Sequence, residues 1–443
     1  MESAQSNGKL SLIQKLSYGV GDLGANLVFN MVSFYLLYYL TDVALLTASL
    51  AGLVLTLVRV IDAFTDPAIG MLSDRTQSRW GRRRPFILFG AIPVGVFFFL
   101  LFAGTPLRGQ TGMFLYFLLI YAVFFISYSV VNVPYSALTP DLTKDPDERT
   151  VLNGYRMACA IIGTLVAAGA TSALVGLFPD ESTGFAMVAA AYGLIFILMS
   201  QIVFWGSKGR DRSVPQTGSQ KVLGLYLSAL KNKPFMLVAV TYIIHSFAVT
   251  TISSSLIYYL KYYIGREGLI STIFLVLLLT AMLFIPLWVW ISKKIGKKQA
   301  YMIGMSVLAC AMVVMFLLKP EQVPFIYVLA FAAGSGLSTF FVLPWAIVPD
   351  TIDYHAQRTG QQIEGVFYGI WNFGPKLGSA VAGFCLGMGL TAFGYVPNLV
   401  TQSSKTILGI RSIFCLVPAV IILCGVVVMS FYRLNQKSPA GSN

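Results

Sequence analysis

The chain has 443 residues, of which 56% are hydrophobic and only 11% are charged, and its mean hydropathy is +0.75. Soluble domains carry about 25% charged residues, so this composition excludes an ordinary soluble protein and indicates a membrane protein with many crossings. The formal net charge of +13 does not indicate a nucleic-acid partner, because the basic residues gather in alternate loops, as membrane topology requires.

Twelve apolar segments of about 20 residues, the length of one helical crossing, follow one another along the chain. They begin near Tyr18, Thr47, Phe86, Gly112, Leu152, Gly184, Phe235, Leu269, Ala300, Pro324, Ile363 and Leu408. The basic loops predict that both termini are cytoplasmic and that the protein is a multi-pass protein of the cell membrane. We expect no removable signal peptide, because the polar start lacks a short apolar core with a cleavage site.

The second apolar segment carries three ionisable residues on one helical face, Arg59, Asp62 and Asp66. A carboxylate at membrane depth costs a few kcal/mol, so it persists only where it faces water, an ion or a partner charge. Two carboxylates one turn apart also repel unless a cation or a proton neutralises one of them. The pattern therefore predicts a cation or proton site; the alternative is a set of salt bridges with Arg59 and Lys376 that only holds helices together.

The longest polar stretch lies between the sixth and the seventh apolar segment, and this position indicates a linker. We therefore expect a six-helix lobe over residues 1–206, a cytoplasmic linker over 207–233, and a second six-helix lobe with a short tail over 234–443.

Two short sequences recur in the two halves. PDLTKDPDERT at Pro140–Thr150 aligns without a gap with PDTIDYHAQRT at Pro349–Thr359, and GRRRP at Gly81–Pro85 is echoed by GKKQA at Gly296–Ala300. Two similar halves in parallel orientation are typical of a two-lobed, all-α transporter with its site near the membrane midplane.

The turn around Gly70, Asp74 and Arg75 resembles the signature loop of the major facilitator superfamily. A narrower resemblance is to the glycoside–pentoside–hexuronide:cation symporters, which include the melibiose and glucuronide carriers. The segments that carry it are LSYGVGDLGAN (16–26), YYLTDV (38–43), RVIDAFTDP (59–67), RTQSRWGRRRP (75–85), VNVPYSAL (131–138), GYVPN (394–398) and FYRLN (431–435). This resemblance implies the major facilitator fold and cation-coupled sugar transport.

For the coupling ion, the resemblance implies Asp62 and Asp66 as carboxylate ligands of Na⁺ or H⁺, with Thr65 and Ser129 as hydroxyl ligands. Thr65 replaces an asparagine of the melibiose carrier, and a hydroxyl can still ligate sodium as a hard oxygen donor. The alternative for both hydroxyls is that they bond only to their own helix backbone. No further cofactor is expected.

For the sugar, the resemblance implies the substrate-binding residues Asn26, Tyr128, Asn132, Arg156, Trp371 and Lys376. Asn26 and Asn132 stand where the melibiose carrier has acidic residues, so we expect a cavity in which Arg156 and Lys376 are less neutralised. Such a cavity favours a uronide or another anionic glycoside. Trp371 offers a flat face on which a sugar ring can stack, and Lys376 can also pair with Asp62 or Asp66.

The repeated segments also predict charge pairs between the lobes at their cytoplasmic ends. Arg149 is expected to pair with Asp350 or Asp353, and Arg358 with Asp141, while Asp74 and Arg75 belong to the same cytoplasmic gate. Ordinary loop solvation is the alternative.

The sequence as a whole predicts a secondary transporter, functional as a monomer among membrane lipids, that uses Na⁺ or H⁺ to drive glycoside uptake. A lysophospholipid transporter of the same superfamily is the main alternative. An intramembrane enzyme could use paired carboxylates as acid and base, but the chain carries no recognisable nucleophile or metal motif. A non-transporting sensor is a further alternative, but a sensor would be expected to carry a soluble output domain.

Overall fold

The computed structural model describes residues 10–143, 145–208, 222–360, 363–399 and 401–434. Most of these residues are helical, and the chain divides into two compact units, residues 1–217 and 218–443. We call these units the first and the second lobe and describe each by itself.

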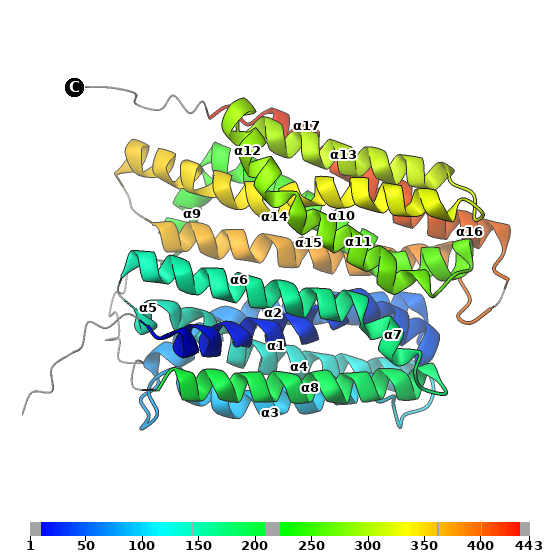
Figure 1. Ribbon diagram of the computed structural model, residues 1–443, viewed down its shortest axis with the longest axis horizontal. Coiled ribbons are helices and arrows are strands. Elements are labelled where there is room, and N and C mark those ends of the chain that lie inside the picture. The colour runs from blue at the N-terminus through cyan, green and yellow to red at the C-terminus, as the bar shows by residue number, and fades with distance from the viewer. Residues whose placement is uncertain (1–9, 144, 209–221, 361–362, 400, 435–443) are drawn as a thin grey trace, which may run out of the picture. The chain divides into compact units, whose positions relative to one another are not determined.

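The described residues of the first lobe form six long helices and two short ones, which Figure 1 shows. The long helices are α1 (Leu12–Tyr38), α2 (Ala48–Arg75), α3 (Arg84–Phe102), α4 (Gln110–Ala137), α6 (Pro146–Gly169) and α8 (Glu181–Gly206), and the short ones are α5 (Thr139–Leu142) and α7 (Thr171–Val175). A π-helical turn, Tyr39–Val43, extends α1.

The second lobe begins with a short helix, α9 (Val222–Leu230), which lies within the stretch expected to be a polar linker; residues 209–221 of that stretch are outside the described residues. The other helices are α10 (Lys233–Tyr258), α11 (Leu269–Leu283), α12 (Ile285–Ile295), α13 (Lys297–Leu317), α14 (Val323–Thr359), α15 (Glu364–Ala392), α16 (Ser404–Arg411) and α17 (Val417–Ser430). π-helical turns follow α10 (Tyr259–Ile264) and join α16 to α17 (Ser412–Leu416).

The predicted all-α membrane architecture is confirmed. Among the described residues, ten helices or helix groups are long and apolar enough to cross a membrane, and the count is eleven if α11 and α12, which are bent by 42° at their junction, make one crossing. The remaining predicted segment, which begins near Ile363, corresponds to α15, whose 29 residues exceed the length of about 20 that a crossing needs. Its seven glycines, together with Glu364 and Lys376, lower its hydropathy.

The two lobes repeat one packing scheme. In the first lobe α1 packs on α6 and α8, α4 packs on α2 and α3, and α3 packs on α8; in the second lobe α10 packs on α15 and α17, α14 on α11 and α13, and α13 on α17. The sequence repeat therefore reflects a repeated three-dimensional unit, as transporters with internal repeats require.

Glycines let equivalent helices of the two lobes approach each other closely. A Cβ on Gly163 of α6 would overlap the backbone oxygen of Leu23 on α1, and a Cβ on Gly378 of α15 would lie 2.5 Å from the backbone oxygen of Ile243 on α10. Small residues at such crossings allow backbone contact between membrane helices.

Replacing Gly163 with alanine is expected to destabilise the first lobe by about 1–3 kcal/mol, because the added methyl meets fixed backbone rather than a movable side chain. Gly154, on the same helix, faces open space, so Gly154→Ala is the matched control and should leave the unfolding temperature unchanged or slightly raised. Thermal unfolding of the two purified variants in one detergent checks the difference. Equal unfolding temperatures would contradict the tight crossing.

Candidate functional site

The carboxylate of Asp62 lies buried between α2 and α4. The hydroxyl of Ser129, on α4, donates to Asp62 Oδ1 at 3.1 Å, whereas the hydroxyl of Thr65 donates to the backbone oxygen of Asp62 at 3.1 Å. Asp66 lies one turn further along α2 and is half-buried. The structure thus brings Ser129 to the acidic pair, while Thr65 makes the backbone bond that the sequence left open as its alternative.

Arg59, one turn before Asp62 on α2, rests against aromatic rings. Its guanidinium carbon is 4.6 Å from the centroid of Phe125 and 5.1 Å from that of Phe29. Tyr128 stacks on Phe29 with 5.9 Å between the ring centroids, so this predicted sugar residue belongs to the same aromatic wall. Within this part of the lobe, one cation and two carboxylates leave a net charge of −1, which suits one bound monovalent cation or proton.

Asp62, Asp66 and Ser129 offer oxygen atoms as ligands. Among the described residues, no group of three or more His, Cys, Asp and Glu side chains is placed to hold a metal ion. Two carboxylates with a neighbouring hydroxyl are hard oxygen ligands, which match Na⁺ or a proton better than a transition metal.

Arg156, predicted to bind the substrate, is paired with a carboxylate that the sequence reasoning missed. Its Nε lies 2.5 Å from Asp22 Oδ2, and its Nη2 lies 3.4 Å from Asp22 Oδ1. The hydroxyl of Tyr135 donates to the same Oδ2 at 2.8 Å, and the guanidinium carbon lies 4.9 Å from the Tyr135 ring centroid. The expectation that Arg156 is poorly neutralised is therefore wrong, because α1 supplies a counter-ion.

The two predicted asparagines lie close to this pair. Asn26 donates to the backbone oxygen of Asp22 at 2.8 Å, and Asn132 lines a small cavity together with Gly21 and Tyr135. A further asparagine, Asn30, donates to the Thr164 hydroxyl of α6 at 3.0 Å. The spacing of Asp22, Asn26 and Asn30 by four residues was the sequence signal that could have revealed this polar face of α1.

Trp371, on α15 of the second lobe, is a packing residue in this structure. Its ring stacks on Tyr242 with 4.4 Å between centroids and a 7° angle, its side chain is only 1% exposed, and Trp345 meets it edge-on. The expected free face for a sugar ring is therefore covered, although the indole N–H has no hydrogen-bond partner among the described residues. Lys376 lies on the same helix, and its pairing with Asp62 or Asp66 stays a prediction.

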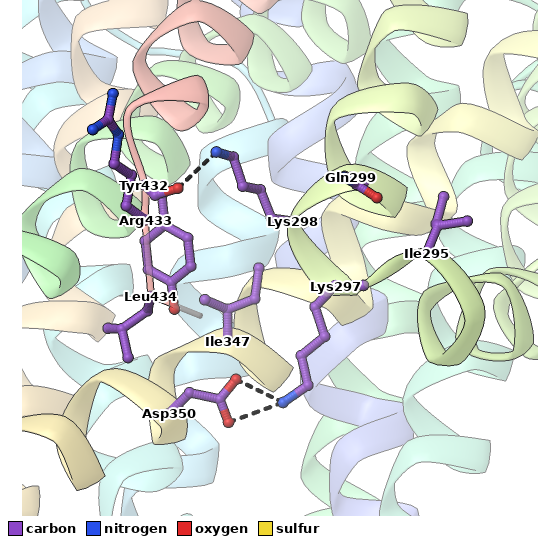
Figure 2. A pocket seen from close by; sticks show the side chains of 10 residues that line it. Ile295, Lys297, Lys298, Gln299, Ile347, Asp350, Tyr432, Arg433 and Leu434 are labelled. Carbon is purple, nitrogen blue, oxygen red and sulfur yellow. Dashed lines mark hydrogen bonds and ion pairs between the residues drawn. The ribbon is translucent and has the colours of Figure 1, made fainter. Parts of the chain in front are cut away.

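Each lobe has a charge cluster at one end, which we call its basic end: Arg82–Arg84 at the start of α3 in the first lobe and Lys297–Lys298 at the start of α13 in the second. Arg83 Nη1 lies 2.6 Å from Asp141 Oδ2 and also donates to the Ala137 carbonyl. Figure 2 shows the equivalent contact, in which Lys297 Nζ lies 2.7 Å from Asp350 Oδ2; Lys297 also donates to the Ala346 carbonyl at 2.9 Å.

A second cation of each basic end donates hydrogen bonds to carbonyls at the end of the last helix of its own lobe. Arg84 donates to the Phe204 carbonyl of α8 at 2.6 Å, and Lys298 donates to the Ser430 carbonyl at the end of α17 at 2.6 Å. Lys298 also donates to the Tyr432 carbonyl just beyond α17 at 2.6 Å (Figure 2). In the second lobe these side chains line a pocket of about 610 Å³. The repeat therefore extends to individual hydrogen bonds.

The residues of the predicted gate also make contacts within their own lobes. Asp141 and Asp350 each have a basic partner within their own lobe, and Arg149 donates to the Thr143 carbonyl at 2.9 Å. Arg358 donates to the Tyr354 hydroxyl one turn away at 3.1 Å. Asp353 and Arg75 are exposed, the side chain of Asp74 lies outside the described residues, and charge pairs between the lobes stay a prediction.

Glu148, in the first turn of α6, ties the start of the chain to the basic end of the first lobe. It accepts hydrogen bonds from the Leu10 amide and, at 2.9 Å, from the Thr143 hydroxyl, and Lys15 Nζ lies 3.6 Å away. Burial opposes its charge, but these donors outweigh burial and lower the pKa of Glu148 below its ordinary value. The carboxylate therefore stays ionised at neutral pH and anchors α1.

Known proteins resemble this chain over nearly its whole length. It is 32% identical to an uncharacterized symporter of Synechocystis sp., covering 98% of this chain and 96% of that protein. It is 31% identical to a candidate sulfoquinovose importer of Escherichia coli (97% and 92% covered) and 30% identical to a glucuronide carrier protein homolog of the same species (97% and 94% covered).

The fold is shared with solved transporters. A bacterial homologue of the human lysosomal transporter Spinster, crystallised in an inward-facing and occupied conformation, matches with a TM-score of 0.71 at 13% identity, covering 95% of each chain. The family model described as MFS/sugar transport protein matches residues 17–436. With this match and the repeated six-helix lobes, the chain belongs to the MFS/sugar transport family of membrane transporters, and it is not an enzyme.

Proposed function

We propose that the protein is a symporter that uses a Na⁺ or H⁺ gradient to accumulate a glycoside, and that uronides and other acidic glycosides are among its candidate substrates. The observation that carries this proposal is the buried Asp62 carboxylate, which stands one turn from Asp66 and accepts a hydrogen bond from Ser129. Relatives named as a symporter, a glucuronide carrier homolog and a sulfoquinovose importer support both parts of the proposal.

In this mechanism the cation neutralises the acidic pair and so favours the state in which the sugar binds. Tyr128 joins the aromatic wall around Arg59, and this wall links the acidic face of α2 to α1, which carries Asn26. Coupling then arises because the cation and the sugar each bind better when the other is present. The carrier changes between its outward-open and inward-open states only when it holds both the cation and the sugar or neither of them.

The proposal also covers placement in the cell. The basic ends of both lobes face the cytoplasm, because arginine and lysine favour that side of the membrane, and the protein works as a monomer in the cell membrane.

Uptake into proteoliposomes tests the proposal. A panel of neutral glycosides, uronides, sulfonated sugars and lysophosphatidylcholine is offered under an imposed sodium gradient, proton gradient or no gradient. Gradient-driven accumulation of a glycoside is the expected result. Transport of lysophosphatidylcholine alone, or glycoside uptake that no cation gradient drives, would overturn it.

Replacing Ser129 with alanine is expected to weaken cation binding about tenfold, because a hydrogen bond to a charged group contributes about 1.5–3 kcal/mol. The measurement is the cation concentration that gives half-maximal uptake. Ser127→Ala is the matched control, because the Ser127 hydroxyl bonds only to the Val123 carbonyl of its own helix among the contacts described, at 2.7 Å. If the two variants needed the same cation concentration for half-maximal uptake, Ser129 would not contribute to cation binding.

A further inference from the structure

Asp22 and Arg156 form a closed set of contacts inside the first lobe. The Asp22 carboxylate accepts from Nε and Nη2 of Arg156 and from the Tyr135 hydroxyl. The guanidinium also donates from Nη1 to the Thr139 hydroxyl at 3.3 Å. Asp22 is 7% exposed and the Arg156 side chain 14% exposed, so the charge of this arginine is matched by a nearly buried carboxylate.

The pair stands at one end of a polar stripe between α1 and α6. Asn26 and Asn30 follow Asp22 at one-turn intervals on α1, and Asn30 reaches Thr164 on α6, the helix that carries Arg156. From Asp22 to Asn30 the stripe is about 12 Å long, at a rise of about 1.5 Å per residue. That length suits a sugar ring with a short substituent, with amides for its hydroxyl groups and a cation at one end.

The acidic group of a sugar would bind Arg156 through the same kind of hydrogen bonds that the Asp22 carboxylate accepts. A carboxylate or sulfonate presents two oxygens to the planar guanidinium, which binds such groups through paired N–H donors. Two anions cannot both take the same donors. Either the acidic group of the substrate displaces Asp22, or Asp22 keeps it out.

We propose that Asp22 is a specificity-determining residue that competes with the acidic group of the substrate for Arg156, an inference that rests on the proposed function. In the empty carrier Asp22 neutralises Arg156, which would be costly to leave as an unpaired buried charge. A neutral glycoside binds with the Asp22–Arg156 pair intact. An acidic glycoside binds only by separating the pair, so Asp22 lowers the affinity for anionic substrates.

The test compares a glucuronide with the neutral glucoside of the same aglycone. Uptake of each is measured in proteoliposomes under the cation gradient that drives transport, for the wild type, Asp22→Asn and Asp22→Glu. The ratio of the glucuronide KM to the glucoside KM is expected to fall about tenfold in Asp22→Asn, since removal of a like charge favours the anion, and to return toward the wild-type ratio in Asp22→Glu. An unchanged ratio in Asp22→Asn would overturn the proposal, because a purely structural pair would affect both sugars alike.

A second pair of variants keeps the test decisive if Asp22→Asn does not fold. The double variant Asp22→Asn/Arg156→Gln removes both charges and leaves no unpaired ion. Its KM ratio is expected to rise above that of the wild type, because the cation that attracts the acidic group is gone; a ratio equal to that of the wild type would overturn the proposal. A wild type that transports neither sugar would overturn the proposed function as well, so the two failures are distinguishable.

Discussion

Substrate accumulation is expected to disappear in an Asp62→Asn variant, although substrate binding should survive. The amide keeps the shape of the side chain and can still accept from Ser129, but it removes the charge that attracts the cation. With one carboxylate and Arg59 left, the net charge of this part of the lobe becomes zero. A monovalent cation driven by about 100 mV contributes about 2.3 kcal/mol, which corresponds to roughly 50-fold accumulation, and we expect the ratio to fall to about one.

Two measurements separate lost coupling from lost folding. Exchange of labelled for unlabelled substrate at equal cation concentrations needs no gradient, so it should persist in Asp62→Asn. Asp42→Asn is the matched control: Asp42 is also buried, but it lies in the π-helical turn after α1, where the Thr41 hydroxyl donates to it at 2.6 Å. Full gradient-driven accumulation by Asp62→Asn would exclude this carboxylate from the ion site.

The two basic ends are expected to differ in their sensitivity to charge removal. In the first lobe the side chains of Arg83 and Asp141 are 10% and 4% exposed, and Arg82 approaches the same carboxylate oxygen at 3.8 Å. Asp141→Asn leaves two arginines beside a neutral amide, and loss of one partner of a buried pair costs roughly 3–5 kcal/mol. We therefore expect a large drop in the yield and unfolding temperature of the folded protein.

Asp350→Asn makes the equivalent change in the second lobe, where the side chains of Lys297 and Asp350 are 31% and 24% exposed. Solvent screens this pair more strongly, so its loss should cost about 1 kcal/mol or less. Thermal unfolding of both variants in one detergent, at low and high salt, gives the comparison. If Asp350→Asn proved as damaging as Asp141→Asn, burial would not be what sets the strength of these contacts.

Much of the fold could be predicted because the membrane limits the choices. Each crossing must be an apolar helix of a set minimum length, so the segment boundaries follow from composition. The break between α11 and α12 was not predicted, since the apolar run continues through it from Leu283 to Pro286. The placement of Ser129 beside Asp62 followed from the family resemblance rather than from spacing.

Pairing between distant residues was the part that the sequence could not supply. Asp22 and Arg156 are 134 residues apart in the chain, and Asp22 is at neither of the two positions at which the melibiose carrier has its acidic residues. The repeat around Asp141 and Asp350 was found, but a repeat shows which residues are equivalent and not whether their partners lie in the same copy. Trp371 was read as a stacking surface because a sequence does not reveal that Tyr242 covers its ring.

The self-contained basic ends also bear on how the protein is made. Arg83 with Asp141, Arg84 with the end of α8, and Gly163 against α1 all join residues of the first lobe. These contacts can form as soon as α8 has left the ribosome, before any helix of the second lobe exists. Translation can thus deliver a finished first bundle to the membrane before the second lobe is made.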